Sequence, residues 1–110
     1  MLIEPVKKRR EILKNFREYL PKIKSAVKDV IGDVEIYVFG SILEGEFVGG
    51  SDVDIMIVAD VESNRKRAEV LAEIEERIGL PLSHPFEFHL LTKDEFDKWV
   101  SIFKPKLKKL

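Results

Sequence analysis

Apolar positions along the chain follow two kinds of spacing, and each predicts its own kind of element. Spacing near the helical period of 3.6 residues predicts helices over residues 5–31, 63–78 and 93–103. Pro21 lies within the first range, where a proline ends or kinks a helix or opens a second one. Ser63 can cap the second helix, and Thr92-Lys-Asp-Glu95 matches a capping box before the third.

Strand-like patterns fill the gaps between these helices. They lie over residues 34–39, 53–59 and 85–91. The second is almost continuously apolar, as a central strand buried on both faces is. Residues 41–47 are expected to form a short helix, and residues 104–110 a loose basic tail. This order of elements predicts an α/β or α+β fold, with a mixed three- to four-stranded β-sheet flanked by helices.

Composition narrows the class of protein. A chain of 110 residues, of which 45% are hydrophobic, is the size of one domain with a real core. The absence of Cys excludes disulfides, Cys-ligated zinc, iron–sulfur clusters and thiol nucleophiles. No apolar run approaches the roughly 20 residues of a membrane span, and the basic N-terminus lacks the apolar region of a secretory signal. We therefore expect a cytoplasmic protein without membrane contact.

The net charge of −1 conceals an uneven distribution of charge. Residues 1–30 carry nine Lys/Arg and four Asp/Glu, residues 31–97 carry five and sixteen, and residues 98–110 carry five Lys and no acid. The acidic block could hold a cation while the basic ends face an anion. Alternatively, the charges could form the heavily charged surface that is common in heat-adapted proteins. The basic run at residues 7–10 could contact nucleic acid but is interpreted as a solvated helix face.

Candidate chemistry is concentrated between residues 40 and 54. Gly40-Ser41 ends one predicted strand, and Asp52-Val53-Asp54 opens the next. Residues two apart on a strand share a face, so the two carboxylates should lie side by side, which is unfavourable without a cation. Mg²⁺ is commonly held by one or two carboxylates together with substrate phosphates. Gly40 would let the backbone approach a phosphate, which backbone amides and the Ser41 hydroxyl could bind.

The third predicted strand supplies another acid. Glu87 and His89 share one face of this strand, opposite Phe86 and Phe88. Glu87 could complete a metal cluster or accept the proton of an attacking hydroxyl. His89 could contact a metal or phosphate, or be an ordinary half-buried strand histidine. Two metal ions about 4 Å apart, bridged by acids, would clamp both oxygens of an in-line displacement at phosphorus, as nucleotidyl transfer requires.

The combined pattern resembles the nucleotidyltransferase superfamily of the DNA polymerase β type. Its signature is Gly-Ser, ten residues and Asp-x-Asp, and here residues 42–51 separate Gly40-Ser41 from Asp52-Val53-Asp54. Ser51 before the first Asp, a Gly in the loop and the chain length make the sequence most similar to the minimal nucleotidyltransferases of archaea and bacteria. The resemblance implies a single domain over residues 1–110, with its core motifs in residues 34–91.

The resemblance also implies a role for each matching residue. The catalytic acids, which would hold two Mg²⁺ ions, would be Asp52, Asp54 and Glu87. The residues that bind ATP or another NTP would be Gly40, Ser41 and Ser51. His89 could be accessory to this site.

Two residues depart from the family pattern. Many relatives have Asp where this chain has Glu87, and Arg where this chain has Glu44 before the loop glycine. A cation for the phosphates would then come from a partner chain or from the basic start of the second predicted helix, at Arg65, Lys66 and Arg67.

The activity implied by the resemblance is Mg²⁺-dependent transfer of a nucleoside monophosphate, in the first instance AMP from ATP. The acceptor would be a hydroxyl of a protein, an RNA or a small molecule, with release of pyrophosphate. Minimal nucleotidyltransferases are commonly paired with HEPN-domain proteins, which implies the antitoxin of a HEPN toxin–antitoxin pair. Two alternatives stay open: a non-catalytic module that neutralises a protein partner and, with weaker support, an RNA-modifying enzyme. A homo-oligomer is also compatible with the sequence.

Overall fold

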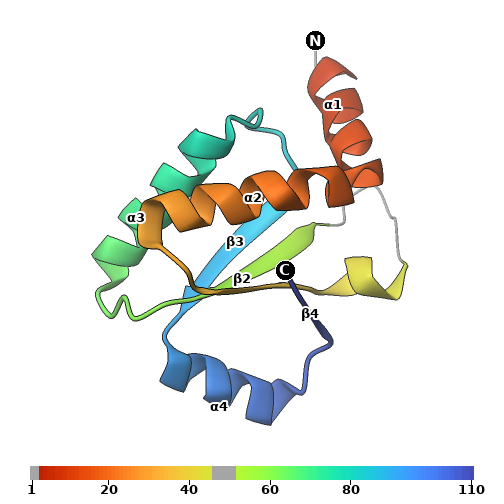
Figure 1. Ribbon diagram of the computed structural model, residues 1–110. Coiled ribbons are helices and arrows are strands. Elements are labelled where there is room, and N and C mark those ends of the chain that lie inside the picture. Colours follow the sequence, from red (N-terminus) through yellow and green to blue (C-terminus); the bar gives the residue numbers. More distant parts are fainter. Residues whose placement is uncertain (1–2, 46–51) are drawn as a thin grey trace.

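The computed structural model describes residues 3–45 and 52–110, whose elements follow the predicted order (Figure 1). The helices are α1 (Ile3–Lys14), α2 (Phe16–Ile31), α3 (Asn64–Ile78) and α4 (Lys93–Phe103). The strands are β1 (Glu35–Phe39), β2 (Val53–Val58), β3 (Phe86–Leu91) and β4 (Leu107–Lys109). A single 3₁₀ turn, η1 (Ser41–Glu44), follows β1.

The four strands form one mixed sheet in the order β3-β2-β1-β4. Strand β1 is antiparallel to both β2 and β4, whereas β2 is parallel to β3. Parallel neighbours need a long crossover connection, and α3 supplies it between β2 and β3. The four-stranded mixed sheet with its helices confirms the predicted α+β fold.

The C-terminal segment differs from its prediction as a loose tail. Residues 107–109 form β4 along the edge of β1, with Leu107 opposite Phe39. The Leu110 backbone N–H also donates to the Ile36 carbonyl oxygen at 2.9 Å. The sequence pattern misses this strand because a short Lys-rich edge strand has no apolar alternation. Its pairing depends on the unpaired backbone groups that the edge of β1 offers.

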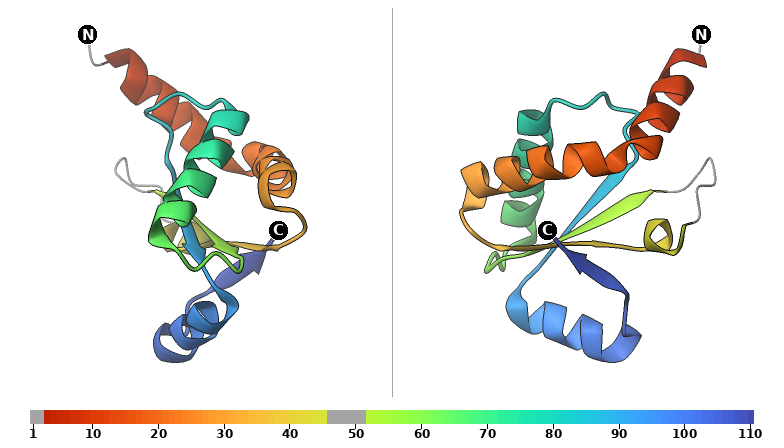
Figure 2. Two further views of the ribbon diagram at one scale, coloured as in Figure 1. Left: turned by 90° about the vertical axis from the view of Figure 1, so that its left-hand side faces the viewer. Right: turned by 45° about the vertical axis from the view of Figure 1, so that its right-hand side comes forward.

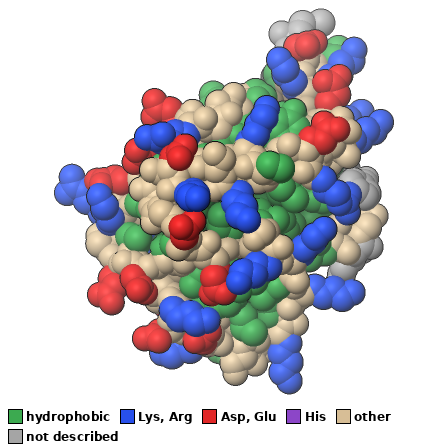
Figure 3. Space-filling model, viewed as in Figure 1, with side chains coloured by type: hydrophobic (Ala, Val, Ile, Leu, Met, Phe, Trp, Pro, Cys, Tyr) green, Lys and Arg blue, Asp and Glu red, His purple; other side chains and the backbone are tan. Residues whose placement is uncertain are grey.

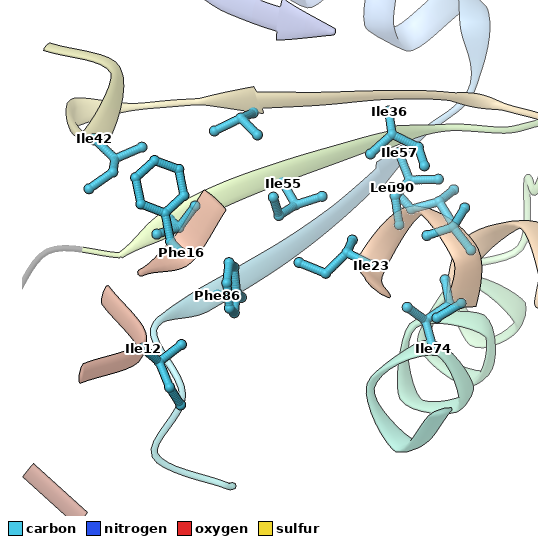
Figure 4. Packing of buried hydrophobic residues seen from close by; sticks show 14 of the residues in the cluster. Ile12, Phe16, Ile23, Ile36, Ile42, Ile55, Ile57, Ile74, Phe86 and Leu90 are labelled. Atoms are coloured by element: carbon cyan, nitrogen blue, oxygen red, sulfur yellow. The ribbon is translucent and has the colours of Figure 1, made fainter. Parts of the chain in front are cut away.

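The main hydrophobic core lies between one face of the sheet and helices α2 and α3 (Figure 1). Strand side chains that include Ile55 and Ile57 meet Ile23 of α2 and Ile74 of α3 (Figure 4). All four of these isoleucines are fully buried. Because strand side chains alternate, the residues between them point to the opposite face of the sheet.

Helix α4 covers part of that opposite face. Phe96 packs there against Met56 and Val58 of β2, and the ring of Tyr37 stacks on it with centroids 5.1 Å apart. The Trp99 ring meets Phe39 edge-on at 5.0 Å. This second, smaller apolar cluster holds α4 on the face of the sheet that also carries Asp54, Glu87 and His89.

The helical pattern over residues 5–31 forms two helices that separate at Asn15, not at Pro21. Pro21 lies inside α2, where its fixed φ suits the helix, but its missing N–H leaves one helical bond unmade and its ring crowds the carbonyl four residues earlier. Ile12 and Leu13 near the end of α1 are buried, while the preceding turns project from the body of the protein (Figure 2). Helix α1 is therefore anchored by its final turns.

The surface that carries α2 and the C-terminus shows acidic and basic side chains interspersed among apolar ones (Figure 3). On this face, the separate charge blocks of the sequence are thus mixed by folding. Over residues 3–45 and 52–110, no helix is both long enough and apolar enough to span a membrane.

Candidate active site

The candidate site lies on the α4 face of the sheet, where β1 ends and β2 begins. Asp54 is the second residue of β2, and in the sheet it is flanked by Phe39 of β1 and Glu87 of β3. Register of the parallel pair β2–β3 sets Glu87 directly beside Asp54, and His89 follows two residues later on the same face. Strand pairing alone therefore brings two acids and an imidazole together.

Asp54, Glu87 and His89 form a cluster with the chemistry of a metal site. One potential ligand atom from each residue lies within 4.8 Å of the others. The Nε2 atom of His89 is 3.1 Å from Oδ1 of Asp54, and both side chains remain partly exposed to solvent. Two carboxylates suit Mg²⁺ or Mn²⁺, and an imidazole extends the set to transition metals. The donors therefore fit a divalent cation.

Gly40 lies against this cluster because its backbone approaches Asp54 closely. A Cβ atom on Gly40 would overlap Oδ2 of Asp54. The residue has φ 92° and ψ −170°, a conformation that is essentially restricted to glycine. Glycine is thus required here both for the backbone conformation and for the space that the Asp54 carboxylate occupies.

Asp52, the first acid of the motif, forms an ion pair with a residue of the N-terminal helix. It precedes β2, and its Oδ1 lies 2.6 Å from an Nη atom of Arg9 on α1. Among the residues that the structure describes, its carboxylate is not part of the Asp54 cluster. Asp54 lies within the strand ladder, whereas Asp52 lies directly before it and contacts a cation on another element.

The segment after β1, which was expected to bind phosphate, begins with a 3₁₀ turn and not with an α-helix. Within the helix predicted over residues 41–47, a four-residue 3₁₀ turn, η1, begins at Ser41, and residues 46–47 lie outside the described residues. It ends at Gly45, whose left-handed φ of 79° closes the turn with an N–H bond to the Ile42 carbonyl oxygen. A single 3₁₀ turn has little of the dipole that a full helix would direct at phosphate. Ser51 lies outside the described residues.

The basic residues proposed for the phosphates lie at the wrong end of the sheet. Helix α3 follows the end of β2, whereas the site lies at the start of that strand. Arg67 is paired instead with Glu95 at 2.9 Å, and Arg65 with Glu69 at 3.5 Å. Neither arginine is directed at Asp54. Among the described residues, the cation that is paired with an acid of the motif is Arg9.

Arg9 and the His89–Asp54 contact are the features of the site that sequence reasoning missed or underweighted. Arg9 looked like one of four basic residues on a solvated helix face. The signal that could have found it is its position one turn before Ile12 and Leu13, which the apolar pattern assigns to the core. That spacing places Arg9 on the side of α1 that faces the protein.

The fold and the site together define a protein of the nucleotide-transferring class. Residues 20–109 match the model of the nucleotidyltransferase domain family, and the chain belongs to that family. Its members transfer a nucleoside monophosphate and generally use an NTP with a divalent metal. This assigns the general activity of the chain and agrees with the resemblance found in the Gly-Ser and Asp-x-Asp motifs.

Two solved structures are similar to this chain. One, an inferred nucleotidyltransferase, is 36% identical over 83% of this chain and 96% of its own, with a TM-score of 0.64. The other, an inferred nucleotidyltransferase from Sulfolobus solfataricus, is 19% identical over 94% of this chain and 84% of its own, with a TM-score of 0.55. The second is a likeness of fold. No curated protein matches the sequence.

Proposed function

We propose that this protein is an Mg²⁺-dependent nucleotidyltransferase that moves AMP from ATP to an acceptor hydroxyl and releases pyrophosphate. The observation that carries the proposal is the convergence of Asp54, Glu87 and His89 beside Gly40 in a nucleotidyltransferase domain. Asp52 would join this set once its contact with Arg9 is exchanged. The proposal treats residues 1–110 as one minimal domain that acts in the cytoplasm.

Each residue would have a distinct task in this reaction. Asp52, Asp54 and Glu87 would hold the divalent cations, which when bound neutralise the charge on the reacting phosphates. Glu87 is the most exposed of the three acids, so its alternative task would be to accept the proton of the acceptor hydroxyl while the two aspartates hold the metal. His89 would orient the Asp54 carboxylate through their 3.1 Å contact. Gly40, Ser41 and Ser51 would line the path of the triphosphate.

Binding of ATP with and without Mg²⁺ tests the metal-dependent part of the proposal. Asp54→Asn and Glu87→Gln should each weaken Mg²⁺-dependent binding of ATP by about tenfold or more, because each removes a charged ligand. Glu76→Gln makes the same chemical change as Glu87→Gln at an exposed position of α3, away from the site, and should bind as wild type does. Calorimetry measures all four proteins. Binding that ignores Mg²⁺ and is equal in every variant would refute the proposed chemistry.

The acceptor is proposed to be a HEPN-domain protein, so that the chain acts as the antitoxin of a HEPN toxin–antitoxin pair. Support for this comes from the resemblance to minimal nucleotidyltransferases. Incubation with α-labelled ATP, Mg²⁺ and a HEPN protein encoded beside this gene should transfer label to that protein. Transfer should disappear with Asp54→Asn.

The same incubation distinguishes the alternative of a non-catalytic binding module. In that case the partner would stay unlabelled and yet bind wild type and Asp54→Asn with equal affinity. Label on RNA instead of protein would favour an RNA-modifying enzyme, whose RNA binding should weaken steeply as salt is raised.

A further inference from the structure

Arg9 contacts the first aspartate of the Asp-x-Asp motif, although it lies in α1, outside the residues matched by the family model. The family model begins at residue 20, whereas Arg9 reaches Asp52 across 43 positions of sequence. The 2.6 Å separation is a close ion pair, and the Arg9 side chain is 23% exposed. A basic residue of the N-terminal helix is therefore paired with an acid of the motif.

Packing of α1 explains why the Arg9 guanidinium is held at Asp52. Ile12 and Leu13 are 4% and 5% exposed and anchor the end of the helix in the main core. Arg9 lies one turn earlier on the same side. Arg10 points away and is exposed, as are Ile3 and Val6 farther out. In chain order, the buried part of α1 thus begins at Arg9 and its contact with Asp52.

The Asp52 carboxylate cannot bind the Arg9 guanidinium and a divalent cation with equal strength at the same time. A carboxylate that coordinates a cation has less negative charge to offer a guanidinium, and the cation repels the guanidinium. Arg9 cannot relieve this by losing its proton, because arginine stays charged in proteins. A guanidinium held beside a metal-bound Asp52 would be attracted to any anion that arrives with the metal. The phosphates of the nucleotide are the anions that a metal at this position would bring.

We propose that Arg9 exchanges partners during nucleotide binding, from the Asp52 carboxylate in the metal-free protein to the triphosphate of the metal-bound nucleotide. The inference rests on the proposed function and adds a substrate-binding residue to it. The planar guanidinium suits two phosphate oxygens at once. Many relatives have an Arg at the position of Glu44, and Arg9 would supply the positive charge that this chain lacks there. Arg65 and Arg67 cannot do so, because they lie beyond the far end of β2.

The exchange predicts that loss of Arg9 changes the affinities for a metal and for a nucleotide in opposite directions. Arg9→Gln removes a competitor for Asp52, so Mn²⁺ alone should bind about two- to fivefold more tightly. The same change removes a phosphate ligand, so an ATP analogue with a non-cleavable α–β bridge, presented with Mg²⁺, should bind about tenfold more weakly. Electron paramagnetic resonance of free Mn²⁺ gives the first affinity, and calorimetry gives the second.

Two further variants separate this role from a structural one. Arg10→Gln makes the same change at the next, exposed position of α1 and should leave both affinities unchanged. Arg9→Lys keeps the charge but not the fork, so Mn²⁺ affinity should stay close to wild type while nucleotide affinity falls. Thermal unfolding of each variant checks that α1 remains docked, and Arg9→Lys carries the test if Arg9→Gln fails to fold.

These measurements distinguish a failure of the partner exchange from a failure of the proposed function. Weaker binding of both Mn²⁺ and nucleotide in Arg9→Gln would overturn the exchange and indicate that Arg9 only holds the site in shape. Unchanged nucleotide affinity would overturn it as well. Failure of the wild-type protein to bind the nucleotide at all would overturn the proposed function itself, and this inference with it.

Discussion

Replacing Gly40 with alanine tests whether the close approach of backbone and carboxylate is what positions Asp54. The new methyl group would overlap Oδ2 of Asp54, so the carboxylate has to move. Moving it separates Asp54 from the Nε2 atom of His89, 3.1 Å away, and disrupts the cluster that includes Glu87. The expected result is a loss of metal binding from a substitution at a residue that is not itself a metal ligand.

Gly32 provides a matched control for this substitution. Its φ of 86° and ψ of −162° closely match the 92° and −170° of Gly40. A Cβ on Gly32 would meet no atom within 4 Å. Gly32→Ala therefore carries the backbone strain of Gly40→Ala without the collision at Asp54, and the difference between the two variants isolates the effect on the site.

The magnitudes follow from these two contributions. Backbone strain at each position should lower the free energy of unfolding by about 1–3 kcal/mol. Breaking the Asp54–His89 contact should add about 1 kcal/mol in Gly40→Ala alone. A domain of this size loses about 4–8 °C in Tm per kcal/mol, so thermal unfolding can resolve the two variants. Mn²⁺ affinity should fall about tenfold or more in Gly40→Ala and stay at the wild-type value in Gly32→Ala.

One result would refute this reasoning directly. If Gly40→Ala binds Mn²⁺ as tightly as Gly32→Ala does, the Asp54 carboxylate is not held by the space at Gly40. As a further check, Asp54→Ala should remove the collision, so that adding Gly40→Ala to it costs no more stability than Gly32→Ala does.

Three further substitutions test other contacts. Thr92→Ala removes the hydroxyl that accepts from the Glu95 backbone N–H, so urea denaturation should show a loss of about 1 kcal/mol with Mn²⁺ affinity unchanged; reduced affinity would contradict this. Tyr37→Phe removes the hydroxyl that donates to Glu35 and holds the pKa of that carboxyl below its ordinary value of 4.5. A carboxyl whose pKa is lower in the folded state stabilises the fold above its unfolded pKa, and this stabilisation is lost as pH falls through the folded pKa. The stability lost in Tyr37→Phe should therefore be larger at pH 7 than at pH 3. An equal loss at both pH values would count against this contact. His89→Gln removes the imidazole that orients Asp54, so binding of Mg²⁺, Mn²⁺ and Zn²⁺ should weaken by a similar factor, and a loss confined to Mn²⁺ and Zn²⁺ would show that His89 is a metal ligand instead.

Local patterns in the sequence were sufficient for most elements of the fold. The Thr92–Glu95 capping box and the Ser63 cap are both present at the helix starts they predicted. Alternation along residues 34–39 correctly separated the core-facing Ile36 and Val38 from their neighbours. These features depend on interactions between residues a few positions apart, so the sequence around each is enough to specify them.

Other features depend on pairing between distant segments. Strand β4 has no pattern of its own and exists because β1 offers it an edge. The separation of α1 from α2 at Asn15 is likewise not marked by the proline that the sequence draws attention to. In both cases the local signal is weak and contacts with the rest of the protein decide the outcome.

The sequence by itself determined the family of this protein and the acids of its motif, since Gly40-Ser41 and Asp52-Val53-Asp54 are a short pattern with a fixed spacing. It also put Glu87 and His89 on one strand face, because alternation depends only on neighbouring residues. Only the tertiary structure decided which groups meet. The register of β2 on β3 brought His89 to Asp54, and the packing of α1 brought Arg9 to Asp52. The physical reason is that periodicity specifies the direction of a side chain, whereas its partner is selected by how the whole chain buries its apolar surface.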